Sequence, residues 1–289
     1  MSDLYFGILI LLVASAVLFI GGLWVGKRLK PRAAGLLFML TLAALLVYEK
    51  FAADQLWMAK LLPFSNLVVI GNFYPPLVAL AASFALRILP KGILRRSVLL
   101  IPFLLLSWVG LVRTVFGAPP ELGNRWTRGV CLQTSDASCS AAAAATLLHA
   151  EPYHIESTEQ EMARLCLTHG SGSRADGTTM FGLYRGLKLK TAGTPWKPVP
   201  FHESLEALQK DFPGPVILTV ELSVGDPRAD NYPNWDPGLR HTVVLFRFLP
   251  NGQALMGDPD AEFGRERWSM DDLRVLWHGD GIKLVHRRI

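Results

Sequence analysis

The first 116 residues are dominated by four long apolar stretches, which cover residues 4–25, 33–48, 64–88 and 97–116. A transmembrane helix needs about 20 consecutive apolar residues, so this pattern predicts a transmembrane domain over residues 1–116 with about four helices. The third stretch contains Asn66, Asn72 and the pair Pro75-Pro76, and we expect its helix to be kinked or broken there. A packing role explains these residues better than a transport path, because no stretch carries a central ionisable residue.

Basic residues beside these stretches predict their orientation. Four Lys and Arg residues lie between residues 27 and 32, and four more, Lys91 among them, lie between residues 87 and 96. Positively charged loops stay in the cytoplasm, whether the middle two stretches span the membrane or are only re-entrant. The last stretch then carries the remaining chain to the other side. We therefore expect a multi-pass membrane protein whose second domain is extracytoplasmic.

Charge and cysteine content differ between the two parts of the chain. The net charge of +5 divides into +8 on residues 1–116 and −3 on residues 117–289. The basic excess therefore belongs to the membrane-flanking segments and gives no indication of nucleic-acid binding. Three cysteines, Cys131, Cys139 and Cys166, exclude a disulfide-dense scaffold. They leave two alternatives for Cys131 and Cys166, a disulfide or two buried thiols.

The pattern changes after residue 116. Residues 117–127 contain two prolines and two glycines and are predicted to form a linker, and residues 128–289 then form a second domain. Helical patterns come first in it, at residues 157–166, 178–187 and 201–212. Strand patterns follow, at residues 215–222, 241–248, 253–256 and 281–286. Helices followed by antiparallel strands indicate an α+β domain.

A candidate nucleophile lies near the start of this domain. Polar, turn-forming residues (135–138) precede Cys139, and five alanines (141–145) follow it. Because Ser and Asp cap helices and Ala favours them, we expect Cys139 at a helix N-terminus, where the helix dipole stabilises a thiolate. Gln133, six residues earlier, is placed to donate a side-chain N–H to an oxyanion at the same point. By itself this pattern more often marks a small buried cysteine.

The predicted strands supply an imidazole and a carboxylate. His241 begins the strand 241–248, and Asp258 lies just beyond the end of its antiparallel partner, with the hairpin turn near Asn251. Antiparallel pairing brings these two ends together, so that the carboxylate can orient the imidazole as it does in a catalytic triad. The loop 225–238, directly before His241, is expected to form a wall of the substrate cleft. Its aspartates lack the spacing of an EF-hand calcium site.

The order of these residues resembles papain-like cysteine peptidases and, more closely, the bacteriocin-processing (double-glycine leader) peptidase domains of ABC exporters. The resemblance covers most of residues 128–288. Its motifs are Gln133 to Cys139, Glu161-Met-Ala-Arg-Leu, Gly177-Thr-Thr-Met-Phe-Gly-Leu, His241-Thr-Val-Val, Gly257-Asp-Pro and Leu276-Trp-His-Gly. It implies that Cys139 is the nucleophile, His241 the general base, Asp258 the orienting acid and Gln133 the oxyanion donor.

The chain departs from that family in three respects. Cys139 lies in the sequence Ser138-Cys139-Ser140, where members of the family commonly have Asp-Cys-Gly. The exporter-linked domains face the cytosol, whereas the second domain of this chain is predicted to lie outside it. The chain also has no Gly-Lys-Ser/Thr motif for ATP binding.

The sequence therefore predicts a membrane α-helical region followed by an α+β, papain-like cysteine peptidase domain with an antiparallel sheet. The predicted protein is a membrane-anchored cysteine peptidase that hydrolyses a peptide bond of a polypeptide through a thioester on Cys139. The alternatives are a papain-fold amidase or transferase and a non-catalytic membrane adaptor that binds leader-like peptides. Expected partners are a polypeptide substrate, the lipid bilayer and a secretion or export system, without nucleic acid. No cofactor is expected, and no metal, because the chain lacks a Cys-x-x-Cys motif and a close histidine pair.

Overall fold

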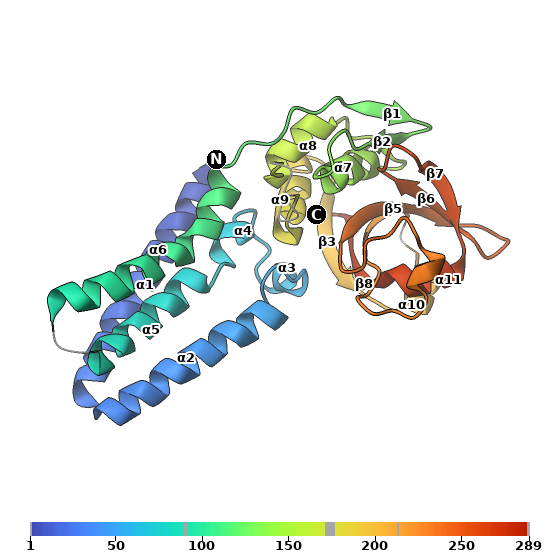
Figure 1. Cartoon of the computed structure of the whole chain (residues 1–289). Coiled ribbons are helices and arrows are strands. Elements are labelled where there is room, and N and C mark those ends of the chain that lie inside the picture. Colours follow the sequence, from blue (N-terminus) through green and yellow to red (C-terminus); the bar gives the residue numbers. More distant parts are fainter. Residues whose placement is uncertain (1, 90–91, 171–176, 213, 288–289) are drawn as a thin grey trace. The chain divides into compact units, whose positions relative to one another are not determined.

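The computed structural model describes residues 2–89, 92–170, 177–212 and 214–287, so Lys91 of the second basic cluster lies outside the described residues. The chain divides into two compact units. One is formed by Met1–Met58 and Asn66–Gly117, and the other by Ala59–Ser65 and Ala118–Ile289. Figure 1 labels the helices and strands of both units.

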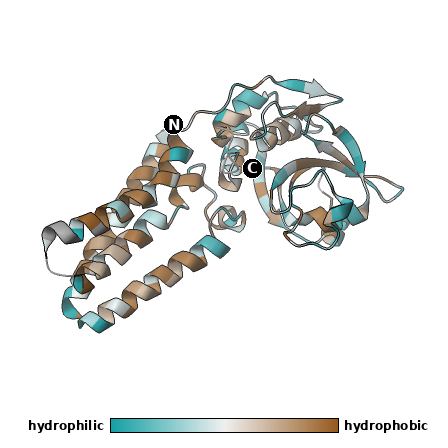
Figure 2. Cartoon of the chain, viewed as in Figure 1, coloured by the Kyte–Doolittle hydropathy of each residue, from teal (hydrophilic) through white to brown (hydrophobic). Residues whose placement is uncertain are grey.

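The first unit is helical, and its helices follow the apolar stretches of the sequence. In chain order these helices are α1 (Ser2–Arg28), α2 (Pro31–Phe51), α4 (Leu67–Ile70), α5 (Tyr74–Ile88) and α6 (Ile93–Phe116). The short helix α3 (Trp57–Leu61) crosses the boundary between the units, which falls after Met58. Within the described residues, four helical stretches are long and apolar enough to cross a membrane: Ser2–Arg28, Pro31–Phe51, Leu67–Ile88 and Arg96–Phe116. Figure 2 shows apolar residues along most of their length.

Helix α5 is the most buried of these helices, and its small residues make this possible. It packs against α1, α2 and α6, and its buried residues include Ala79, Ala82 and Ser83. Small side chains let neighbouring helices approach closely. A Cβ added to Gly22 of α1 would lie only 2.0 Å from the Ser83 Oγ. Large apolar side chains of α1 such as Ile20, which is 64% exposed, face away from the protein, as a lipid environment allows.

The third apolar stretch is broken, and its sequence explains where. Helix α4 ends at Ile70 and α5 begins at Tyr74. The Asn72 Oδ1 accepts a hydrogen bond of 3.2 Å from the Tyr74 N–H. Pro75 and Pro76 lie in the first turn of α5, where a missing N–H leaves no helical hydrogen bond unmade. The prolines therefore start a second helix instead of kinking a continuous one.

The second unit combines helices with a six-stranded antiparallel sheet, the α+β arrangement that the sequence predicts. Its further helices are α7 (Cys139–His149), α8 (Glu159–Cys166), α9 (Met180–Lys190), α10 (Leu205–Lys210), α11 (Met270–Leu276) and the 3₁₀ turn η1 (Ala229–Asn231). Its strands are β1 (Arg125–Thr127), β2 (Val130–Leu132), β3 (Trp196–His202), β4 (Val216–Val220), β5 (His241–Phe248), β6 (Ala254–Asp258), β7 (Gly264–Trp268) and β8 (Trp277–His286). The sheet has the order β3-β8-β4-β5-β6-β7, and β1 and β2 form a separate pair.

The two edge strands of the six-stranded sheet, β3 and β7, were not predicted from the sequence. A helix was predicted over residues 201–212, but α10 begins only at Leu205, and Phe201 lies in β3. The predicted helix is therefore present but starts later, because the residues before it form β3. This edge strand pairs with β8, a position that tolerates its residues Pro198 and Pro200. The other edge strand, β7, was not predicted because its sequence, Gly-Arg-Glu-Arg-Trp, is mostly polar.

The segment predicted as a linker, residues 117–127, joins the second unit before it ends. The Leu122 N–H donates a 3.0 Å hydrogen bond to the Gln160 Oε1, and the Asn124 N–H donates one of 3.3 Å to the Glu159 Oε2. The residues that follow form β1 and pair with β2. From Leu122 onward, this segment is therefore part of the folded unit.

The two faces of the sheet are covered by different helices. Val243 and Leu245 of β5 belong to a buried apolar cluster that also contains Leu208 of α10 and Leu273 of α11. Side chains alternate between the faces of a strand, and Thr242, between His241 and Val243, instead contacts α7. Strand β5 therefore has the apolar core on one side and α7, with the candidate nucleophile, on the other.

Candidate active site

Cys139 is the first residue of α7. The chain reaches it through a tight turn, in which the Ser138 Oγ donates a 2.8 Å hydrogen bond to the Ser135 carbonyl and accepts one of 3.2 Å from the Ser135 N–H. The Cys139 side chain is partly exposed, whereas Ala141–Ala145 behind it are fully buried. The sulfur therefore lies at the positive end of the helix dipole, which favours the thiolate.

The five alanines bring α7 close to the sheet. Helix α7 packs against β5, β4, β6 and β2, and none of its alanines exposes surface. A helix face made of methyl groups can pack at short range in a dense interior. At the start of this contact the Ser140 Oγ lies 2.8 Å from the Thr242 Oγ1. The residues that follow Cys139 and His241 in the chain therefore hydrogen bond to each other.

His241 and Asp258 meet at the open end of the β5–β6 hairpin. The His241 Nε2 lies 2.8 Å from the Asp258 Oδ1, and Asp258 is only 3% exposed. The same carboxylate oxygen accepts a 2.8 Å hydrogen bond from the Asp260 N–H, which holds the carboxylate in place. Since Asp258 engages Nε2, Nδ1 is the ring nitrogen available to Cys139.

The Cys139 thiol and the His241 imidazole are coupled. Burial alone would raise the pKa of Cys139, but the hydrogen bond to His241 and its positive charge, with smaller contributions from Ser140 and the Thr242 backbone, lower this pKa overall. Burial alone would lower the pKa of His241, but its hydrogen bonds to Asp258 and Cys139 and the charges of both residues raise it. These opposite shifts favour a thiolate–imidazolium pair at neutral pH.

Gln133 directly follows β2 and is anchored beside Asp258. Its backbone N–H donates a 2.6 Å hydrogen bond to the Pro259 carbonyl. The next residue, Thr134, donates hydrogen bonds of 2.8 Å from both its N–H and its hydroxyl to the buried carboxylate of Glu159. Within the described part of the chain, the buried Gln133 Oε1 has no hydrogen-bond partner. The backbone of Gln133 is therefore held, while its side-chain oxygen is not.

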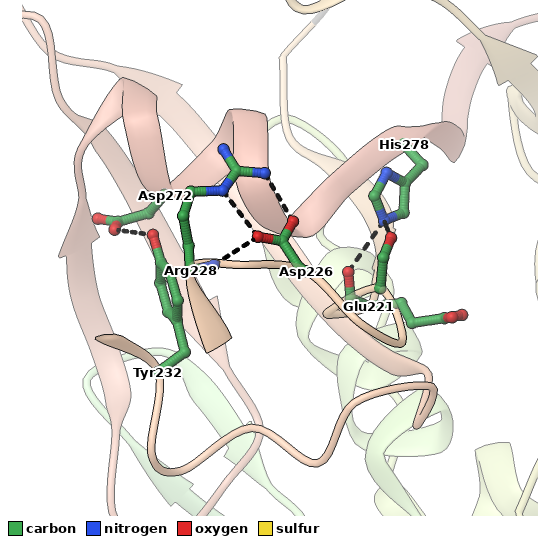
Figure 3. Close-up of polar contacts among 7 residues, drawn as sticks. Glu221, Asp226, Arg228, Tyr232, Asp272 and His278 are labelled. Atoms are coloured by element: carbon green, nitrogen blue, oxygen red, sulfur yellow. Dashed lines mark hydrogen bonds and ion pairs between the residues drawn. The ribbon is translucent and has the colours of Figure 1, made fainter. Parts of the chain in front are cut away.

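The loop between β4 and β5 is attached to neighbouring elements on both sides, as Figure 3 shows. The Tyr232 hydroxyl donates a 3.0 Å hydrogen bond to the Asp272 Oδ1 of α11. The His278 Nε2 of β8 donates one of 3.0 Å to the Glu221 carbonyl. These contacts hold the loop that directly precedes His241.

This loop lines a cavity of about 260 Å³ that also reaches Asp258. Its lining includes the aromatic side chains of Tyr232, Trp235, Phe263 and Trp268. The Trp235 ring centroid lies 5.9 Å from those of both His241 and Trp268. Glu266 also lines the cavity, and burial raises the pKa of its carboxyl group. Ligand pockets commonly measure about 300–1,000 Å³, so this cavity is small.

The other two cysteines have a different environment from Cys139. Cys131 and Cys166 are buried free thiols, and burial raises the pKa of each to about 12. The structure therefore contains the two-thiol alternative and not the disulfide. Within the residues that the structure describes, no group of three or more His, Cys, Asp or Glu side chains is arranged to hold a metal ion.

The sequence prediction missed the roles of Ser140, Thr242 and Trp235 around the site. A contact between residues 102 positions apart in the chain leaves no mark in a hydrophobic pattern. The one available signal was Ser140 itself, a polar residue just inside a helix, where the family that the chain resembles has glycine.

No family model matches the sequence, and no curated protein matches it. Among solved structures, the chain is similar to the peptidase domain of Streptococcus ComA, a bifunctional ABC transporter involved in a quorum-sensing pathway. The identity is 20%, the match covers 55% of this chain and 98% of that chain, and the TM-score is 0.42. It is also similar to the peptidase domain of Streptococcus mutans ComA, with 21% identity, coverage of 54% and 98%, and a TM-score of 0.37.

A third similar structure is a double glycine motif protease from an AMS/PCAT transporter in complex with the leader peptide. Here the identity is 17%, the match covers 59% of this chain and 95% of that chain, and the TM-score is 0.39. The first two are peptidase domains, and the third is a protease.

Proposed function

We propose that this chain is a membrane-anchored cysteine peptidase that hydrolyses peptide bonds of a polypeptide substrate. The observation that carries the proposal is the His241–Asp258 pair, in which the carboxylate holds one ring nitrogen of His241 at 2.8 Å. His241 also lowers the pKa of the Cys139 thiol, which lies at a helix N-terminus. A nucleophile, a base and a group that orients the base are the parts required for nucleophilic catalysis.

The geometry supports a two-stage reaction. The Cys139 thiolate attacks the carbonyl carbon of the scissile bond, and the negative charge on the carbonyl oxygen is stabilised at the N-terminus of α7 and by the Gln133 amide. The His241 imidazolium then protonates the leaving amine as the C–N bond breaks, which leaves a thioester. His241 next takes a proton from water, and the hydroxide attacks the thioester. The carboxylic acid product departs, and the thiolate–imidazolium pair is restored.

The substrate is proposed to be a polypeptide of the leader type. This proposal rests on the motifs around Cys139, His241 and Asp258, which resemble double-glycine leader peptidases. The leaving amine receives its proton from His241, so the residues that follow the scissile bond lie on the side of that ring. Trp235 contacts the same ring and lines the cavity, and the cavity is therefore proposed to receive a side chain of the leaving segment.

The four apolar helices are proposed to span the membrane, with the basic loops in the cytoplasm and the peptidase unit outside it. Their length and composition and the positive-inside rule support this arrangement. A membrane-impermeant maleimide applied to intact cells after mild reduction should label the partly exposed Cys139. Labelling that appears only after the membrane is opened would contradict the orientation but not the chemistry.

Hydrolysis by the purified full chain in detergent tests the proposed reaction. Peptides that contain two consecutive glycines are incubated with the wild type, with Cys139→Ala, and with Cys166→Ala as a matched control at a buried thiol. Cys139→Ala should abolish cleavage, and Cys166→Ala should keep it. Cleavage that survives in Cys139→Ala would refute the assignment. Conjugates formed with an added amine would indicate a transferase, and binding without cleavage would indicate an adaptor.

A further inference from the structure

Ser140 and Thr242 form a buried hydroxyl pair beside the proposed catalytic residues. Their side-chain oxygens lie 2.8 Å apart, and each residue is only 2% exposed. One follows Cys139 in α7, and the other follows His241 in β5. Buried hydroxyl groups need hydrogen-bond partners, and these two partner each other at the point where the helix start meets the strand start. We name them the hydroxyl pair.

The direction of this hydrogen bond follows from what each atom can donate. A hydroxyl group has one hydrogen and two lone pairs. The Ser140 side chain and the Thr242 backbone also lower the pKa of the Cys139 thiol, as hydrogen-bond donors do. A thiolate can only accept, so for Ser140 to stabilise it the Ser140 hydroxyl donates its hydrogen to the sulfur and accepts the hydrogen of the Thr242 hydroxyl. The three groups then form a relay from Thr242 through Ser140 to Cys139.

We propose that Ser140 and Thr242 are positioning residues that hold the Cys139 sulfur against the His241 ring and stabilise its thiolate through this relay. The inference deepens the proposed peptidase function, since hydrolysis begins from that thiolate. It also gives a physical role to the Ser138-Cys139-Ser140 sequence. A glycine after the cysteine has no hydroxyl group and could not form the relay.

The charged groups around the sulfur are separate from the hydroxyl pair. His241 of β5 lowers the pKa of the Cys139 thiol, and the carboxylate of Asp258 in β6 hydrogen bonds to the His241 ring. On other elements packed against α7, the charge of Glu159 in α8 raises the pKa of Cys131 in β2, and the charge of Arg185 in α9 lowers that of Cys166 in α8. Removing the hydroxyl at position 140 changes none of these charges. A change in the pH dependence of Cys139 would therefore report on the relay.

The test measures alkylation of the full chain in detergent by iodoacetamide across pH, with mass spectrometry quantifying each cysteine separately. Cys131 and Cys166, which are buried free thiols, serve as internal standards. Ser140→Ala should move the midpoint of Cys139 alkylation upward by about 1–2 pH units, because a thiolate loses a hydrogen-bond donor. Thr242→Val should move it in the same direction, since Ser140 then lacks its donor.

Three further variants separate positioning from general damage. The double variant Ser140→Ala/Thr242→Val should move the midpoint no further than Ser140→Ala, because the two residues act as one unit. Thr242→Ser keeps the hydroxyl group and should keep the wild-type midpoint. Thr168→Val is a matched control, since it removes a similar 2.6 Å hydroxyl contact with Thr178 at the start of α9, and it should leave the midpoint unchanged.

A wild-type midpoint in folded Ser140→Ala would overturn the proposal. If Ser140→Ala does not fold, the comparison of Thr242→Val with Thr242→Ser decides, and equal midpoints in these two would overturn it. Alkylation needs no substrate, so the two proposals fail separately. A shifted midpoint in a chain that cleaves no peptide supports the relay and refutes the peptidase, and cleavage without a shift does the reverse.

Discussion

Both units contain a helix of small residues that packs closely against neighbouring elements, but the neighbours of the two helices differ. In the first unit, α5 packs its alanines and Ser83 against helices such as α1, whose large apolar side chains face outward. In the second unit, the alanines of α7 lie against a sheet whose large apolar side chains are buried. Small residues set a short distance in both places. At α7 the short distance also brings the candidate nucleophile to the sheet, because Cys139 and Ser140 lie at the start of the helix.

Among changes that keep the Cys139 sulfur, removal of His241 should have the largest effect, because it leaves the close contact of α7 intact but removes the proposed base. His241→Ala should lower the rate of peptide hydrolysis by at least ~10³-fold, since the base, the acid and the partner of the thiolate are lost together. Asp258→Asn should cost less if the carboxylate only orients the ring. Steady-state kinetics measure both, and an equal or larger loss in Asp258→Asn would show that Asp258 does more.

A larger side chain in α7 should break the close contact itself. Ala144 lies four residues after Ser140, on the same side of the helix, and is fully buried. Ala144→Leu should destabilise the second unit by about 1–3 kcal/mol through overpacking and slow Cys139 alkylation at neutral pH. Ala207→Leu, at an exposed position of α10, is the control. Unchanged alkylation in Ala144→Leu would show that the helix-to-strand distance does not matter.

The pH dependence of hydrolysis tests the opposite pKa shifts of Cys139 and His241. The rate should rise as pH passes the lowered pKa of Cys139, because the thiolate forms there. It should fall as pH passes the raised pKa of His241, about 10, because the imidazolium that protonates the leaving amine is lost. Values of kcat/KM across pH measure both limbs. An acid limb near pH ~8.5, the value of an ordinary cysteine, would contradict the ion pair.

Substitutions in the first unit are expected to have the smallest effect on the reactivity of Cys139. Gly22→Leu should disrupt the packing of α1 on α5, because a Cβ there meets Ser83 at 2.0 Å. Gly21→Leu is its matched control, since a Cβ at Gly21 meets nothing within 4 Å. Thermal unfolding in detergent should show a loss for Gly22→Leu alone, with Cys139 alkylation unchanged in both. Lost alkylation in Gly22→Leu would mean that the first unit affects the site.

The parts of the fold that the sequence predicted are those set by local pattern. The apolar stretches give the long helices, and the hairpin of β5 and β6 follows from two short strands and a turn near Asn251. That hairpin alone places His241 beside Asp258. Edge strand β3 was missed because Pro198 and Pro200 are acceptable only where a strand has one neighbour, and the position of a strand in a sheet is a tertiary property.

In the candidate site, too, some features follow from the local sequence and others depend on the tertiary fold. Cys139 was predicted at a helix start from the turn before it and the alanines after it, and both are local features of the sequence. The contact of Ser140 with Thr242 and the packing of Trp235 on His241 join residues from different elements, and no local pattern encodes them. The pKa shifts of Cys139 and His241 also depend on burial and on partners that only the folded chain supplies.

Covalent labelling by an electrophilic peptide, such as a peptide aldehyde or vinyl sulfone with two consecutive glycines, tests the central claim most directly. The full chain in detergent is incubated with the reagent at neutral pH, and mass spectrometry locates the adduct. The account predicts a single adduct on Cys139 that is lost in His241→Ala, while Cys131 and Cys166 stay unmodified. No adduct on Cys139, or one of equal extent in His241→Ala, would contradict a thiolate activated by His241.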